Sequence, residues 1–271
     1  MKRFKILFWA GIMSAVIMSC QKNEVESSVN DVLIEKEIEI ENLLADLDAF
    51  SEEVIDNQLG VLKSATTGIN DDDGCPVITW YRNAEPRKMI IDFGPECEGK
   101  DGKLRSGKII ITSSSFEDMS ATRTKTFENF SVNGWGIDGV ITKKITHNIE
   151  EKTRIAEVTE EVTLTSEEKA GTRSGTMTRK HELGERFNWR DDVTSSWGGI
   201  VTDWQDGQTV TKTISEDNPL VFLHACRQIV SGVLSVTSGE NSWSIDYGQG
   251  DCDNKATINR NGVEREVRIG R

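Results

Sequence analysis

The sequence is poor in the residues and motifs that mark common enzymes. It has only three histidines, His147, His181 and His224, and none lies in a His-x-x-x-His spacing that would preform a metal site. It has no Gly-x-Ser-x-Gly nucleophile elbow and no Walker loop. The acidic run at residues 70–74 lacks the alternating ligands and distal glutamate of an EF-hand. We therefore predict no catalytic residue, no metal site and no cofactor.

Positive charge is also scarce. The chain has 32 lysines and arginines against 45 aspartates and glutamates, which gives a formal net charge of −13. So acidic a chain is repelled by nucleic acid and by anionic lipid headgroups, and we exclude nucleic acid as a partner. Apolar residues make up only 36% of the sequence, which suits β-strands with one solvated face. No βαβ alternation is present, so a doubly wound sheet is not expected.

The N-terminus has the layout of a lipoprotein signal peptide at residues 1–19. Lys2, Arg3 and Lys5 form a charged region, and the apolar run that follows, Ile6–Met18, has 13 residues. A bilayer core of about 30 Å needs a longer helix, so a removable signal is favoured over an uncleaved membrane anchor. Cleavage before Cys20 would leave this cysteine for lipidation. It would also take the formal net charge from −13 to −16, because the signal carries three positive charges.

The residues after Cys20 bear on location. Gln21-Lys22-Asn23-Glu24 resembles the short export tag that follows the lipidated cysteine in Bacteroidota-type lipoproteins. The resemblance implies an outer-membrane lipoprotein at the cell surface rather than one confined to the periplasm. The lipid would be the contact with the membrane.

The mature chain divides into four segments by pattern. We expect a lipidated tether at 20–28, a helical segment at 29–63, a linker at 64–74 and an antiparallel β domain at 75–271. In the helical segment, apolar residues recur at spacings of three and four, which indicates one amphipathic helix or two, with a restart at Ser51. We expect its acidic residues on the outer, solvated face and its apolar face on the β domain; a partner-binding coiled coil is the alternative.

From Cys75 onward the pattern is almost entirely β. Residues 155–165 alternate, with the apolar Ala156, Val158, Val162 and Leu164 on one face, and Val210 and Ile214 share a face in the same way. Strong hairpin turns separate such segments: Asp101-Gly102, Asn133-Gly134, Asp138-Gly139, Asp206-Gly207 and Asn261-Gly262. We predict a mainly β fold with one large antiparallel sheet, either a curved meander or a sandwich, and the helix against one face.

The four cysteines of the mature β region lie in two stretches of similar sequence. In each copy a cysteine opens an apolar strand, and the next strand ends in Ile-Asp-aromatic-Gly, with a second cysteine three or four residues further on. The two motifs are Ile91–Gly94 and Ile245–Gly248. Each copy therefore indicates a hairpin closed by a disulfide. Of the three possible disulfide connectivities, this repeated pattern favours a Cys75–Cys97 and a Cys226–Cys252 disulfide.

These motifs resemble a group of Bacteroidota cell-surface lipoproteins of unassigned function. The resemblance covers most of the chain from Cys75 onward and depends on two runs, Ile91 to Ile109 and Cys226 to Ala256. It implies a secreted, lipid-anchored, β-rich protein. It transfers no catalytic residue.

Three tryptophans form the most suggestive cluster. Trp189, Trp197 and Trp204 fall within 16 residues, among amide and carboxylate side chains. Such a set suits stacking on sugar rings, but core packing in a domain short of large apolar residues is favoured over a glycan site.

Paired carboxylates give a weaker signal for chemistry. Asp191-Asp192, Asp203 with Asp206, and Glu150-Glu151 could be the two acids of a glycoside hydrolase, but such pairs arise by chance in so acidic a chain. We expect a non-enzymatic lipoprotein with a binding or envelope-structural role, whose surface-protein partner is unidentified. A glycan-binding accessory lipoprotein is the alternative.

Overall fold

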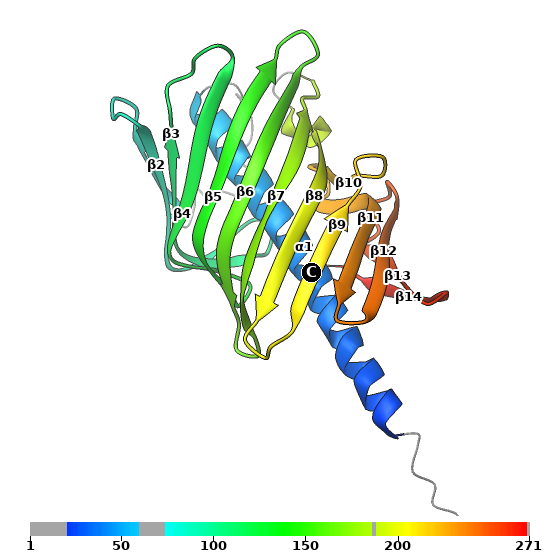
Figure 1. Cartoon of the computed structure of the whole chain (residues 1–271). Coiled ribbons are helices and arrows are strands. Elements are labelled where there is room, and N and C mark those ends of the chain that lie inside the picture. The colour runs from blue at the N-terminus through cyan, green and yellow to red at the C-terminus, as the bar shows by residue number, and fades with distance from the viewer. Residues whose placement is uncertain (1–20, 60–73, 186–187, 270–271) are drawn as a thin grey trace, which may run out of the picture.

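The described part of the chain consists of one long α-helix, a short 3-10 helix and one large antiparallel sheet (Figure 1). The computed structural model describes residues 21–59, 74–185 and 188–269, with helix side chains from Val32 to Gln58. The helix is α1 (Gln21–Leu59), and a short 3-10 helix, η1 (Trp189–Asp191), precedes β8. The strands are β1 (Val77–Tyr81), β2 (Arg87–Glu98), β3 (Leu104–Ser113), β4 (Ser120–Val132), β5 (Trp135–Asn148), β6 (Thr153–Thr165), β7 (Ala170–Glu182), β8 (Val193–Trp204), β9 (Thr209–Ile214), β10 (Leu220–Leu223), β11 (Gln228–Ser238), β12 (Asn241–Gln249), β13 (Lys255–Arg260) and β14 (Val263–Arg268).

The sheet is a meander with one local departure. Strands β1 to β8 pair in chain order, and so do β11 to β14. Between β8 and β11 the short strands β9 and β10 share one row, each pairing with both long neighbours. All pairs are antiparallel, as expected for hairpin connections. The mainly β prediction is confirmed, as a single curved sheet rather than a sandwich.

The sheet curves around α1, which runs across its concave face (Figure 1). Apolar side chains of the helix, such as Leu33, Ile38 and Phe50, belong to the same buried cluster as the inward-facing strand residues. Figure 1 shows the N-terminal part of the helix projecting beyond the sheet. Helix α1 is continuous from Gln21, so the segment expected to be a tether is helical and no restart occurs at Ser51.

The expected polarity of the helix is wrong. Its acidic side chains do not form an outer, solvated face: Glu37 is 0% exposed and Glu41 is 6% exposed. The concave sheet covers most of the helix between Leu33 and Asp56, apart from the face that carries Glu35, Lys36 and Glu39, so acids as well as apolar residues are buried there.

The repeated Ile-Asp-aromatic-Gly motif has a structural cause. The glycine takes a left-handed backbone, with φ of +66° at Gly94 and +92° at Gly248. Each aspartate accepts a hydrogen bond from the glycine two residues on, at 2.9 Å for Asp92 and 2.8 Å for Asp246. This turn re-aims the strand and leaves the intervening aromatic ring in the core. Only glycine adopts that backbone without strain, which explains why both copies have it.

Both expected disulfides are present. Cys75 bonds Cys97 beside the β1–β2 hairpin, and Cys226 bonds Cys252 beside the β11–β12 hairpin. The sequence separations are 22 and 26 residues, and loops of this size restrict the unfolded chain by similar amounts.

Removing either disulfide should therefore destabilise the fold by about 3 kcal/mol, with little difference between the two. The variants are Cys75→Ala with Cys97→Ala, and Cys226→Ala with Cys252→Ala. Urea unfolding of each double variant, beside the oxidised parent, measures the change. A free energy of unfolding equal to that of the parent would contradict the assignment.

Candidate functional site

The interface between α1 and the sheet is lined with charge. The helix contributes acids that are buried or nearly so: Glu37, Glu41, Asp46, Asp48, Glu52, Glu53 and Asp56. The concave face of the sheet and its turns contribute the matching cations: Lys103, Arg105, Arg123, Lys125, Lys143, Arg154, Arg173, Arg179, Lys212 and Arg227. Buried charges persist only when they are paired, so this match is a condition for the helix to lie where it does.

One group of ion pairs surrounds Glu37 and Glu41. The ammonium of Lys212 lies 2.7 Å from a Glu37 oxygen and 2.8 Å from a Glu41 oxygen. Arg173 donates to both Glu41 oxygens, at 2.5 and 3.2 Å, and its Nε lies 2.9 Å from Glu160 on β6. The indole of Trp204 donates to Glu37 at 2.8 Å. These partners tie the helix to β7, β8 and β9.

A second group surrounds Asp48 and Glu52. Lys143 pairs with both acids, and Arg179 lies 2.8 Å from the second oxygen of Asp48. Lys125 is more distant, at 3.3 Å from Asp48. One turn further along the helix Asp56 pairs with Arg154 at 2.8 Å.

The pKa values follow from this balance. Burial by itself would raise the pKa of Glu41, but the charges of Arg173 and Lys212 outweigh it and hold that pKa well below the ordinary value. Asp48 behaves in the same way beside Lys143 and Arg179. For Lys125, burial dominates and lowers the pKa to about 8, because Asp48 compensates only in part and Lys143 repels.

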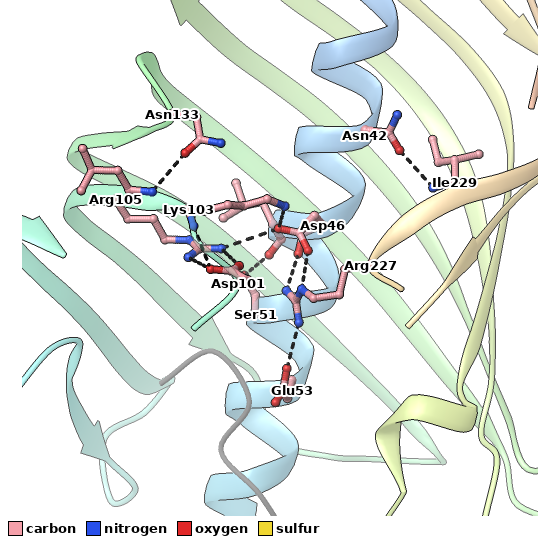
Figure 2. Close-up of polar contacts among 12 residues, drawn as sticks. Asn42, Asp46, Ser51, Glu53, Asp101, Lys103, Arg105, Asn133, Arg227 and Ile229 are labelled. Atoms are coloured by element: carbon pink, nitrogen blue, oxygen red, sulfur yellow. Dashed lines mark hydrogen bonds and ion pairs between the residues drawn. The ribbon is translucent and has the colours of Figure 1, made fainter. Parts of the chain in front are cut away.

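The third group centres on Asp46 and joins the two sides of the sheet (Figure 2). Lys103 and Arg105 approach from the β2–β3 side, with N–O distances of 2.5 and 3.6 Å, while Arg227 reaches Asp46 from the other side at 2.7 Å. Arg227 also lies 3.2 Å from Glu53. Asp46 on α1 therefore links the β2–β3 turn to the turn at Arg227, although these two turns are far apart in the strand order of the sheet.

A groove of about 970 Å³ lies beside this group. One wall is α1 between Val32 and Leu43, and the opposite parts come from Lys103, the turn at Arg227 and the residues of β14. Pockets of about 300–1,000 Å³ are typical of ligand sites. Three other concavities are far smaller, with volumes of 10, 30 and 40 Å³.

Two polar groups at the groove have no partner within the described part of the chain. Gln228 is 6% exposed, and its Oε1 atom is buried without a hydrogen bond. A buried carbonyl without a donor costs about 1–3 kcal/mol. Arg268 is exposed at the rim and forms no ion pair with a described residue.

Histidines that are far apart in the sequence meet at another small cavity. Thr194 Oγ1 lies 3.0 Å from His181 Nδ1 and 3.0 Å from His224 Nε2, and His181 Nε2 lies 3.2 Å from Asp192. A hydroxyl, an imidazole and a carboxylate in a chain are the components of nucleophilic catalysis. The cavity that they line has a volume of only 40 Å³, which admits water but no organic substrate.

The structure separates the three tryptophans considered for glycan binding. Trp204 is 3% exposed and hydrogen-bonded to Glu37, Trp189 is 6% exposed, and Trp197 packs half-buried against the core. Two of the three therefore offer no free indole face. Cys20, the expected lipidation site, lies outside the described residues.

The carboxylate pairs serve turns. Asp203 accepts from Thr209 and Asp206 accepts from the Gln208 backbone, both at the β8–β9 turn. Asp192 accepts the Gly184 N–H at 2.9 Å. Among the described residues no cluster of three His, Cys, Asp or Glu side chains could hold a metal ion.

Sequence reasoning missed the buried charges, although a signal was present. Glu160 occupies the same inward phase as Val158 and Val162, and Lys212 lies between Val210 and Ile214 on the inward face. A charge in phase with apolar neighbours on one strand indicates a partner inside the fold. The groove had no comparable signal, because its walls come from separate parts of the chain.

Comparison with protein-family models, with curated proteins and with solved structures finds no match to this chain. No helix within residues 21–59, 74–185 and 188–269 is long and apolar enough to span a membrane.

Two lysines should respond in opposite ways to the same substitution. Lys212→Met leaves Glu37 and Glu41 short of a cation in the core and should cost about 3–5 kcal/mol. Lys125→Met removes a poorly paired buried ammonium while Asp48 keeps Lys143 and Arg179, so stability should stay within about 1 kcal/mol or rise. Urea unfolding at neutral pH compares them, and equal losses would contradict the charge assignment.

Stability should fall as pH decreases from 6.5 to 4. Burial, followed by the neighbouring His181, lowers the pKa of His224 from 6.5 to about 4. Over this window the unfolded state binds a proton that the folded state does not, which costs on the order of 3 kcal/mol at the acidic end. Unfolding titrations should show a shallower pH dependence for His224→Asn than for the parent. Burial also lowers the pKa of His147, but less strongly, so His147→Asn should change the slope less than His224→Asn does. A slope unchanged in His224→Asn would refute this account.

Proposed function

We propose that this protein is an exported, lipid-anchored and non-enzymatic binding protein of the outer membrane, displayed at the cell surface, whose ligand occupies the groove beside α1. The observation that carries this proposal is the groove itself, with its volume of about 970 Å³ beside α1. The N-terminal sequence supports the anchor, because a charged segment and an apolar run end at Cys20.

The helix would link the anchor to the ligand site. Helix α1 begins at Gln21, directly after Cys20, and reaches the groove wall at Val32. A helix rises 1.5 Å per residue, so the groove would lie within about 20 Å of the lipid along the helix axis. The buried acids of the same helix fix it in the sheet. The lipid, the helix and the groove would thus form one rigid unit at the membrane surface.

Cell fractionation and protease treatment test the proposal. The parent should sediment with the outer membrane, take up a labelled fatty acid, and be degraded by proteinase K in intact cells. Cys20→Ser should abolish labelling and move the protein out of the membrane fraction. Cys75→Ser loses a disulfide but keeps Cys20, so it should still be labelled and sediment with the membrane.

Two outcomes would contradict this account. Membrane retention of Cys20→Ser would refute the lipid anchor. Protection of the parent until the cells are lysed would refute surface display.

A further inference from the structure

The outer edge of β14 is available for pairing. Within the described chain β14 ends the sheet and only β13 pairs with it. The N–H of Ile269 donates to the carbonyl of Asn254 at 2.9 Å, on the β13 side. Hydrogen-bonded positions alternate in an antiparallel pair, so Val267 also bonds toward β13, while the backbone groups of Glu266 and Arg268 point the other way. These groups form a free row of donors and acceptors.

This free edge opens into the groove. Residues 265–269 line the groove along one side, while Lys103 and Asn133 line it elsewhere. Side chains of β14 at alternate positions face the core, since Val267 is 8% exposed and Ile269 2% exposed. A strand added next to β14 would therefore continue the sheet across α1. Six residues of strand extend about 20 Å, the length of β14 itself.

The groove also specifies what such a strand should contain. Val32 offers apolar surface on the helix, since it lies in this wall and is 57% exposed. A bound strand would present every second side chain to this wall. Arg268 at the rim lacks a counter-ion among the described residues and suits a carboxylate.

We propose that the groove binds an extended polypeptide segment of another protein by β-strand addition to β14. The segment has apolar residues at alternate positions and an acidic residue near Arg268. This inference rests on the proposed function, because it takes the groove as the ligand site. Main-chain hydrogen bonds to the edge supply affinity in this mode of recognition, and alternate side-chain contacts supply specificity.

A second copy of this chain is a poorer occupant. Charged side chains crowd the edge at Glu264, Arg265 and Glu266, and charge on an edge strand opposes the pairing of two sheets. A second copy would also bring its β13 and neighbouring strands into space bounded by Lys103 and Asn133. A single strand brings no neighbouring strands and therefore fits the space bounded by Lys103 and Asn133.

The experiment selects short random peptides on the purified mature protein and measures the best ones by fluorescence anisotropy. Selected sequences should alternate apolar residues and carry an acid. The peptide is then N-methylated at one backbone position at a time. Methylation should weaken binding at every second residue and leave the residues between unaffected, because only alternate N–H groups face β14.

Substitutions in the protein test the same backbone hydrogen bonds. Glu266→Pro deletes an outward N–H and should weaken peptide binding about tenfold, whereas Glu266→Ala keeps that N–H and should bind as the parent does. The stability of each variant is measured in parallel, so that a folding defect is recognised.

Three outcomes would overturn this inference: no peptide enriched above a blocked-bead control, an N-methyl scan without a two-residue period, or self-association of the parent that Glu266→Pro abolishes. The assay uses purified protein, so it fails or succeeds independently of where the protein is located. A protein that fails here but passes the Cys20 and protease tests remains a surface lipoprotein with a different ligand.

Discussion

The position of an acidic helix inside a curved sheet depends on charge compensation. An apolar helix could rotate or slide within such a sheet with little change in buried area, whereas each buried acid of α1 needs its own cation. Lys212 bridges Glu37 and Glu41, and Arg227 joins Asp46 from the side opposite Lys103. Uncompensated ions cost several kcal/mol in the interior, so the alternatives are strongly disfavoured. We interpret the pairs as setting the register of the helix.

This register determines where the groove lies. The sheet continues around α1 from β1 to β14 and leaves one face of the helix open between Val32 and Leu43. Lys103 and Arg227 form the Asp46 pairs and also line the groove, so the same contacts that hold the helix shape the opening. The free edge of β14 follows from the same geometry, since the sheet stops before it encloses the helix.

The sequence predicts the layout better than the interior. Turn pairs such as Asn133-Gly134 and the two-residue alternation predict a meander, and the repeated Ile-Asp-aromatic-Gly motif predicts both disulfides, because these signals are local. The turn predicted at Asp138-Gly139 is wrong, because both residues lie inside β5 and pair with β6. The acids of α1 were placed on the wrong face, because polarity ordinarily marks the solvated side of a helix. That inference fails where a sheet surrounds the helix. The inward-facing charges of Glu160 and Lys212 were not predicted, for the same reason.

Native-state hydrogen exchange at neutral pH tests most directly whether the ion pairs make α1 an integral part of the core. The account predicts that amides of α1 between Leu33 and Asp56 exchange only by global unfolding, with the same free energy as those of β5, β6 and β7. Exchange of the helix through a separate opening of lower free energy, while these strands stay protected, would contradict it.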